Sequence, residues 1–278
     1  MPLPSSFSPP KFACGLLLGL LLGGCAGTAL LLHHLWQRLP SVDHLADFAP
    51  AMPLRIHARD GTLLAEYGQE RREVVPLERI PVHVQQALLA IEDTDFHRHR
   101  GVDVRGIARA AWSNAMTGRT GQGASTITMQ VARTFFLTRD KTYSRKLAEV
   151  LLAYKLERAY DKDKLLELYM NQVYLGERAY GFAAAASVYF DKPLDQLTVA
   201  EAAMLAGLPK APSAYNPVAN RERAVLRQHY ILQRLHALGH LDAAGYRQAL
   251  AEPLRLRPPT PSIRPQAAHA VEQVRQAM

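Results

Sequence analysis

Cysteine is scarce in this chain of 278 residues, which contains only two. Both of them, Cys14 and Cys25, lie in an apolar stretch near the N-terminus. The rest of the chain therefore cannot build a disulfide framework or a cysteine-based zinc site. Internal repeats are absent as well, and hydrophobic residues make up 48% of the chain against 21% charged residues. This composition argues against general disorder, and the length allows one large domain or two modest ones.

Acidic residues are outnumbered by basic ones, 25 to 33, which gives a formal net charge of +8. Such a balance favours anionic partners, and nucleic acid, phospholipid headgroups and phosphorylated substrates are all admissible on this ground. A patterned metal site is also missing. His97 and His99 form an H-x-H pair, but no third ligand follows at a useful spacing, so the metal ligands stay unknown.

The apolar stretch near the N-terminus is long enough to cross a bilayer. Residues 12–32 are 21 residues without a charge, and a transmembrane helix needs about 20. The stretch is too long for a typical cleaved signal, and it ends in no clean small-residue cleavage site. We therefore expect a cytoplasmic tail over 1–11, an uncleaved anchor over 12–32 and a juxtamembrane linker over 33–53, with an external body. Lipidation of Cys25, which follows Leu-Gly-Gly, is the alternative.

A short β region is predicted after the linker. Residues 54–58 alternate in polarity, Asp60-Gly61 is a turn pair, and residues 63–67 follow. This pattern predicts a β-hairpin, with residues 71–75 as a candidate third short strand.

Helices are predicted over most of the remaining chain, because apolar residues recur there at helical spacing between turn residues. We expect one domain over 54–251, then a Pro- and Arg-rich linker and the start of a further region over 252–278. The predicted helices are Val82–Ile91, Val104–Met116, Ser125–Phe136, Ser144–Tyr160, Lys162–Asn171, Phe182–Tyr189, Val199–Ala206, Arg221–Leu238 and Ala243–Ala251.

Three carboxylates and four cationic or titratable side chains follow one another at the end of the first of these helices. The sequence is Glu92-Asp93-Thr94-Asp95-Phe96-His97-Arg98-His99-Arg100-Gly101. A carboxylate at a helix C-terminus faces the negative end of the helix dipole, which raises its pKa toward that of a working base. Glu92 is therefore the first candidate for a general base. A solvated, salt-bridged helix end explains the same residues, so both interpretations stay open here.

A glycine-rich loop leads into a second candidate region, Gly123-Ala124-Ser125-Thr126-Ile127-Thr128-Met129-Gln130. Ser125 is suited to cap the helix that starts here, and Gly123 lets the backbone approach a ligand closely. A helix N-terminus behind such a loop suits an anion. An ordinary capped helix after a flexible loop is the alternative.

A cationic cluster follows that helix. It consists of Arg133, Lys141, Arg145 and Lys146, with Glu149 as its one carboxylate. Arg145 and Glu149 are four residues apart and so share a helix face. Because cations outnumber the carboxylate, charge is left for a phosphate ligand. A salt-bridged exposed face is equally compatible with these residues. The next segment, Lys162–Gly176, is an amphipathic helix with a glycine stop, and its Leu, Tyr and Met positions are predicted to be core.

Five blocks of this chain, taken in order, resemble those of the peptidoglycan glycosyltransferases. These are the transglycosylase domains of class A penicillin-binding proteins and their monofunctional relatives. The blocks are E-D-T-D-F-H-R-H-R-G, G-A-S-T-I-T-M-Q, R-K-L-A-E, K-D-K-L-L-E-L-Y-M-N-Q-V-Y-L-G and R-Q-H-Y-I-L. The resemblance covers roughly residues 52–250. It implies a mainly α, lysozyme-like, two-lobed glycosyltransferase domain with a small N-terminal β-hairpin region and one N-terminal transmembrane helix. The smaller lobe is expected to dip into the outer leaflet.

The resemblance also assigns site residues, position by position. Glu92 takes the place of the catalytic base, and Glu149 that of the second catalytic glutamate. The positions of the family's substrate and pyrophosphate contacts are held by Asp93, Ser125, Gln130, Arg133, Lys141, Arg145 and Lys146.

The chain departs from the family pattern at a few of these positions. This chain has Met129 where the family usually has Gln, and Arg133-Thr134 where it usually has Lys-Asn. It has Lys141 where Arg is common, and Gln228 where the family has the second of two paired arginines. Charge is kept at the phosphate positions, so we expect activity. Loss of a bidentate Arg fork at Lys141 is expected to weaken binding.

The implied reaction is polymerisation of lipid II into β-1,4-linked glycan by inverting transfer, with release of undecaprenyl pyrophosphate. Glu92 would take the proton of the attacking sugar hydroxyl, and the cations would hold the leaving pyrophosphate. A divalent cation, Mg²⁺, is the candidate cofactor. The implied partners are lipid II, the growing glycan strand, the membrane and other cell-wall synthesis proteins, and nucleic acid is not expected. The implied location is the bacterial inner membrane, with a single-pass anchor and a periplasmic or extracellular catalytic domain.

Three other functions are compatible with parts of the sequence. A lytic, lysozyme-like enzyme would need no pyrophosphate recognition, which the cationic cluster argues against. An inactive scaffold would not need Glu92 and Glu149, and DNA binding fits poorly with an anchor. The chain contains no K-T-G element and no convincing S-x-x-K nucleophile, so peptide cross-linking is not encoded in it. We therefore expect a fragment of a class A protein, ending near an interdomain linker.

Overall fold

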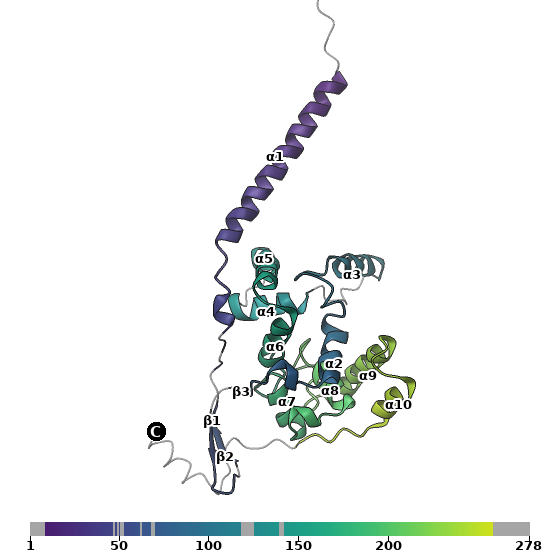
Figure 1. Ribbon diagram of the computed structural model, residues 1–278. Coiled ribbons are helices and arrows are strands. Elements are labelled where there is room, and N and C mark those ends of the chain that lie inside the picture. Colours follow the sequence, from purple (N-terminus) through teal and green to yellow (C-terminus); the bar gives the residue numbers. More distant parts are fainter. Residues whose placement is uncertain are drawn as a thin grey trace, which may run out of the picture.

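The computed structural model describes residues 9–46, 48, 50, 53–61, 63–67, 70–117, 125–138 and 142–257. These residues form a mainly helical protein, as predicted (Figure 1). The helices are α1 (Pro9–Gln37), α2 (Val82–Glu92), α3 (Val104–Thr117), α4 (Ile127–Phe136), α5 (Tyr143–Ala159), α6 (Lys162–Gln172), α7 (Phe182–Phe190), α8 (Val199–Ala206), α9 (Arg221–Ala237) and α10 (Ala243–Ala251). Short 3-10 turns are η1 (Asp43–Leu45), η2 (Leu77–Arg79) and η3 (Leu194–Gln196), and the strands are β1 (Leu54–His57), β2 (Leu63–Tyr67), β3 (Arg71–Arg72) and β4 (Ala179–Tyr180).

Each helix predicted between residues 82 and 251 is present, with ends that differ by no more than two residues. Turn and cap chemistry accounts for this agreement. Asp161 and Asp242 accept hydrogen bonds from the backbone N–H groups of Lys164 and Gly245, and so start α6 and α10. Side-chain caps of this kind satisfy N–H groups that a helix start leaves free.

Helix α1 projects away from the helical body in Figure 1. Among the residues that the structure describes, no helix is both long and apolar enough to cross a membrane. Residues 12–32 are helical, but the structure describes the side chains of only some of them. The membrane anchor expected there stays a prediction. Residues 1–8 of the predicted tail and residues 258–278 of the predicted linker and further region lie outside the described residues.

The predicted hairpin is confirmed. Strands β1 and β2 pair antiparallel, with Leu54 opposite Tyr67 and a register shift at Ile56/His57. The third strand forms, but it does not extend the hairpin. β3 pairs in parallel with β4, which lies more than one hundred residues further along the chain. A two-residue strand such as β4 carries no alternation from which it could have been predicted.

The core lies where the alanine-rich helices α7 and α8 meet α2 and α9. Every residue of α8 after Val199 is buried. Small side chains let neighbouring helices approach closely, and α8 packs against α2, α7, α9 and α10. Its start is fixed by a capping box between Thr198 and Glu201, and Glu201 also pairs with Lys192 at 2.7 Å.

A close contact between the turn after α2 and helix α5 positions the site. Gly101, the last residue of the acidic and basic block, has a φ of +89°, and a Cβ atom there would lie 2.9 Å from the backbone oxygen of Ala153. A residue with a side chain would be strained at this φ and would push α5 away. Glycine at this position therefore brings the end of α2 next to the helix that carries Glu149.

Candidate active site

A cleft of about 1200 Å³ opens beside the C-terminal end of α2. Its walls come from the end of α2, the first half of α3, the start of α4, the loop after α8 and one face of α9. Five of the predicted site residues line it: Glu92, Asp93, Ser125, Gln130 and Arg133. Segments far apart in the sequence thus supply one concave surface, which is the usual form of a ligand site.

Glu92 is the last residue of α2 and lies in this cleft. Its Oε2 accepts a hydrogen bond from Gln130 Nε2 at 2.9 Å. Burial raises the pKa of Glu92, while the Gln130 hydrogen bond and the charges of Arg227 and Arg133 act in the opposite direction. The predicted upward direction is therefore confirmed, but its main cause is loss of water around the carboxylate. The helix dipole was the only cause that sequence reasoning had supplied.

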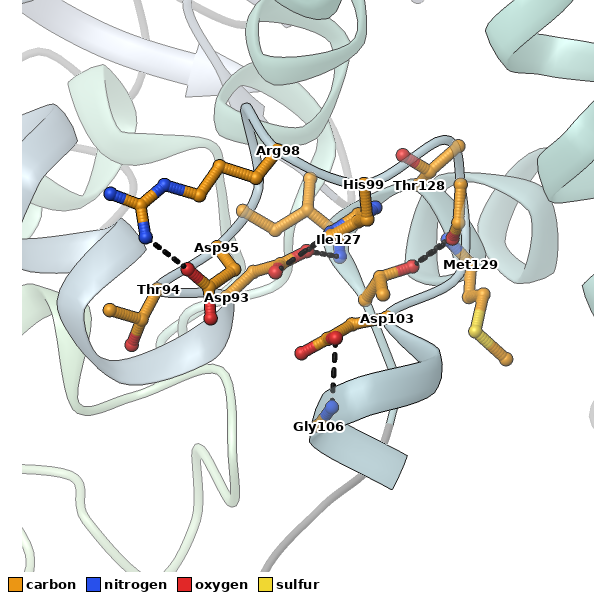
Figure 2. A network of polar contacts seen from close by, with 12 residues as sticks. Asp93, Thr94, Asp95, Arg98, His99, Asp103, Gly106, Ile127, Thr128 and Met129 are labelled. Carbon is orange, nitrogen blue, oxygen red and sulfur yellow. Dashed lines mark hydrogen bonds and ion pairs between the residues drawn. The ribbon is translucent and has the colours of Figure 1, made fainter. Parts of the chain in front are cut away.

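Asp93 follows Glu92 and points away from solvent, with a side chain that is 3% exposed. Its carboxylate accepts hydrogen bonds from His99 Nε2 at 3.0 Å and from the backbone N–H of Ile127 at 2.9 Å. Figure 2 shows Asp93 between His99 and the first turn of α4. These contacts join the end of α2 to the start of α4, so Asp93 positions Glu92 relative to Gln130. A direct contact of Asp93 with substrate stays a prediction.

The cap of α4 is Thr126, and the prediction of Ser125 for this role was wrong. Thr126 has extended dihedral angles, its Oγ1 accepts from the backbone N–H of Met129 at 3.2 Å, and its hydroxyl donates to the Gly101 oxygen at 2.5 Å. Ser125 stands one residue before the cap and accepts a hydrogen bond from Lys146 Nζ at 2.7 Å. Gly123, predicted to face a ligand, lies outside the described residues.

Glu149 lies on α5 with 1% of its side chain exposed. Its Oε1 accepts from Lys146 Nζ at 2.9 Å, and the same ammonium group bonds Ser125 at the cleft wall. The structure therefore brings Ser125, Lys146 and Glu149 together. Of these three residues only Ser125 lines the cleft, so Glu149 is linked to the cleft wall through Lys146 and Ser125.

Of the remaining predicted cations, Arg133 and Arg145 differ in their exposure and in their hydrogen-bond partners. Arg133 is exposed at the cleft wall, with Nη2 3.5 Å from Gln130 Oε1. Arg145 is half-buried, and its Nε has no hydrogen-bond partner among the described residues. A buried guanidinium nitrogen in this condition is available to an anionic ligand. Lys141 lies outside the described residues.

Sequence reasoning missed a second group of cations that line the cleft. Arg223, Arg227 and Arg234 of α9 line the cleft, together with Lys210 and Arg109. The three arginines are spaced by four and seven residues, which places them on one face of a helix. That spacing was a visible signal, but nothing in the sequence showed that this face of α9 turns toward Glu92.

No group of three or more His, Cys, Asp or Glu side chains suited to a metal ion occurs in the part of the chain that the structure describes. Two other carboxylates of the cleft already have partners, since Asp95 pairs with Arg98 and Asp103 caps α3 at Gly106 (Figure 2). Mg²⁺ usually takes one or two protein carboxylates together with waters and substrate phosphates. The Mg²⁺ expected from the sequence stays a prediction.

Comparison with known proteins identifies the family. The family model described as Transglycosylase matches residues 60–236. A putative transglycosylase from Cupriavidus necator is 52% identical over 236 residues, which cover 85% of this chain and 93% of that protein. The chain therefore belongs to the transglycosylase family, and the assignment to the peptidoglycan glycosyltransferases made from the five sequence blocks is confirmed.

Longer relatives match as well. Penicillin-binding protein 1A of Neisseria meningitidis serogroup A is 48% identical over 264 residues, which cover 95% of this chain and 33% of that protein. The chain thus spans about a third of the length of these relatives. A crystal structure of penicillin-binding protein 1A from Haemophilus influenzae matches 83% of this chain and 24% of its own, with 28% identity and a TM-score of 0.49.

Proposed function

We propose that this protein polymerises lipid II into β-1,4-linked peptidoglycan glycan by inverting transfer, with release of undecaprenyl pyrophosphate. One observation carries the proposal. A glutamate with a raised pKa lies in a cleft that is lined by cations from α3, α4 and α9. This arrangement suits a donor sugar whose leaving group is an anion and an acceptor hydroxyl that must lose a proton.

Glu92 is the proposed base. Its raised pKa brings it closer to neutral pH, where a general base is most effective. The Gln130 hydrogen bond stabilises the ionised form, so the carboxylate can still accept a proton from a sugar hydroxyl. A single displacement with this base inverts the configuration of the donor carbon, which turns an α-linked donor into a β-linked product.

The cations of the cleft are proposed to hold the pyrophosphate. Arg133 and Lys146 supply charge on the α4 and α5 side, and Arg227 supplies it from α9. A pyrophosphate leaving group is already weakly basic, so cations stabilise its departure better than a protonated acid would. Glycoside hydrolysis, in contrast, uses a second carboxylic acid at the leaving oxygen. Glu149, the second glutamate predicted from the sequence, is bonded to Lys146, which favours transfer from a pyrophosphate over glycan cleavage.

Glu149 is proposed to act through Lys146. Its buried carboxylate holds the ammonium group against Ser125, at the edge of the cleft. In this position the lysine has a donor to spare for a phosphate oxygen, because an ammonium group has three. The role of Glu149 as a second catalytic glutamate is thereby given a physical basis, which is placement of charge.

A membrane location is proposed for the same reason, since the substrate is lipid-linked. The uncharged residues 12–32 lie within α1, and the segment after α1 is attached to α5. Lys155 donates to the Pro40 oxygen at 2.8 Å, and the Tyr160 hydroxyl donates to the Val42 oxygen at 2.7 Å. We propose a single-pass anchor in the bacterial inner membrane, with the catalytic domain on the periplasmic side.

Helix α3 supports this orientation. It exposes Val104, Trp112 and Met116, which are 65%, 68% and 66% exposed. In Figure 1, α3 and α5 lie at the end of the body from which α1 projects. Exposed apolar side chains gathered on one helix are typical of a surface that meets a membrane or another protein.

Polymerisation of labelled lipid II in detergent, with and without Mg²⁺, tests the proposal. The parent protein is expected to give a ladder of glycan products on a gel, and the Glu92→Gln variant none. Normal ladders from the variant would remove Glu92 as the base. Release of soluble sugars from finished peptidoglycan by the parent would instead indicate a lytic enzyme.

A further inference from the structure

Tyr169 connects the core of the protein to the proposed base. The residue lies on α6, and only 4% of it is exposed. Its hydroxyl donates to Gln130 Oε1 at 3.2 Å, and Gln130 Nε2 donates to Glu92 Oε2 at 2.9 Å. Residues of α6, α4 and α2 thus form one chain of hydrogen bonds that ends on the carboxylate.

The direction of this chain is set by the donors around Gln130. An amide group offers one acceptor oxygen and one donor nitrogen. The oxygen of Gln130 faces two donors, the Tyr169 hydroxyl and Nη2 of Arg133 at 3.5 Å. The nitrogen must therefore face Glu92. If the tyrosine hydroxyl were removed, the amide could turn over and present its oxygen to Glu92, which favours the protonated carboxyl group.

We propose that Tyr169 is a positioning residue for glycosyl transfer: its hydroxyl holds the Gln130 amide so that Glu92 stays ionised and able to accept a proton. This inference rests on the proposed function of Glu92 as the base. The prediction that Tyr169 belongs to the core is confirmed. The ring does fill the core, but the hydroxyl has a separate role.

Three other charged groups act on the pKa of Glu92, and all three are kept in Tyr169→Phe. They are Arg133 on α4, Arg227 on α9 and Asp93 beside Glu92 itself. Helix α8 also packs against α2, but its one charged residue, Glu201, is paired with Lys192. Tyr169 does not titrate in the working range, because burial and the nearby charge of Glu92 hold its pKa well above the ordinary value. It therefore remains a donor whenever Glu92 is ionised.

The test compares two buried tyrosines. Tyr169→Phe removes the hydroxyl that reaches Gln130. Tyr189→Phe is the matched control, because Tyr189 is fully buried and its hydroxyl donates to the Leu175 oxygen at 2.9 Å, away from Glu92. We expect the acidic limb of the pH profile of kcat/KM to move upward by about 0.5–1 pH unit in Tyr169→Phe, which corresponds to one hydrogen bond. No shift is expected in Tyr189→Phe.

A second readout does not depend on activity. The side-chain carboxyl carbon of Glu92 can be titrated by NMR in protein labelled with ¹³C-glutamate, with the signal identified by its loss in Glu92→Gln. Glu92 is expected to titrate at higher pH in Tyr169→Phe than in the parent. An unchanged titration, or an equal shift in Tyr189→Phe, would overturn the proposal even if the parent polymerises lipid II. A shift specific to Tyr169→Phe in a protein that makes no glycan would support the hydrogen-bond chain and reject the proposed reaction.

Discussion

The Lys146 ammonium group lies 2.9 Å from the carboxylate of Glu149, yet the two side chains differ sharply in exposure, 45% for the lysine and 1% for the glutamate. A buried carboxylate needs a compensating charge, whereas a half-exposed ammonium group can be hydrated. Removing Lys146 would therefore leave the buried Glu149 carboxylate without a compensating charge, whereas removing Glu149 would leave an ammonium group that water can still solvate. The same lysine is one of the cations that we assign to the pyrophosphate, so its two roles can be separated by mutation.

Lys146→Met is expected to lower the free energy of unfolding by about 1–3 kcal/mol, because it leaves the Glu149 carboxylate buried without its partner. The double variant Lys146→Met/Glu149→Gln removes both charges and is expected to recover most of that stability. Neither variant is expected to polymerise lipid II at the parent rate, since both lack the cation. Urea denaturation and glycan synthesis would be measured on the same samples.

Recovered glycan synthesis in the stable double variant would show that Lys146 serves the fold alone. Lys155→Met is a suitable control, because Lys155 lies further along α5 and bonds backbone oxygens of the segment after α1.

Glu92→Gln is expected to stabilise the protein at neutral pH, although it abolishes glycan synthesis. Burial raises the pKa of Glu92 above 4.5 in the folded state. The folded protein therefore holds this proton more tightly than the unfolded chain does, and the resulting stabilisation is full below the unfolded pKa and is lost as the pH rises through the folded pKa. Glutamine keeps the shape of the side chain without this loss. We expect a gain of about 1 kcal/mol, or roughly 2–4 °C in Tm, near neutral pH.

The pH dependence distinguishes this origin from better packing. The difference in Tm between Glu92→Gln and the parent is expected to shrink as the pH falls toward the unfolded pKa. A difference that stays constant with pH would mean that the charge of Glu92 does not oppose folding.

The helices could be predicted from the sequence because their causes are local. Apolar spacing and turn residues fix α8 at Val199–Ala206, and the predicted bounds match the observed ones. The pairing of β3 with β4 could not be predicted, since it depends on how the chain returns after more than one hundred residues. The cap of α4 was misplaced by one residue because Ser125 and Thr126 are both good cap residues, and only the backbone angles decide between them.

The site was predictable only in part, for a related reason. Glu92 and Gln130 could be named from their sequence blocks, but the hydrogen bond between them joins residues that are 38 positions apart. Arg227 and Tyr169 were missed as site residues because one lies on an amphipathic helix and the other on a helix that looks like core. Their functional placement arises from tertiary packing, which brings α9 and α6 to the end of α2.

Arg227→Met is expected to reduce kcat/KM for lipid II by about 10- to 100-fold, with little change in folding. The guanidinium group lies 5.6 Å and 5.5 Å from the rings of Tyr215 and Tyr230, and its Nε has no hydrogen-bond partner among the described residues. It is thus held in place with hydrogen-bonding capacity unused. Arg227→Lys is expected to restore only part of the loss, because lysine lacks the planar fork that binds two phosphate oxygens at once.

Arg247→Ala on α10 is the control for this prediction, since Arg247 is exposed and does not line the cleft. Steady-state kinetics at two salt concentrations would also be informative. A direct phosphate contact predicts that salt weakens substrate binding less in Arg227→Met than in the parent. Equal salt dependence in the two proteins would contradict the contact.

Thr126 and Ser125 offer a last comparison, because adjacent hydroxyls have different roles here. Thr126→Ala removes both the cap of α4 and the hydrogen bond to the Gly101 oxygen, and is expected to lower the free energy of unfolding by about 1–2 kcal/mol. Thr126→Ser keeps the hydroxyl and should lose much less. Ser125→Ala should change stability by less than about 0.5 kcal/mol. It frees Lys146 from one of its two partners, so its effect is expected in kinetics. Urea denaturation of the three variants tests this assignment. A larger loss of unfolding free energy for Ser125→Ala than for Thr126→Ala would mean that Ser125 is the cap of α4.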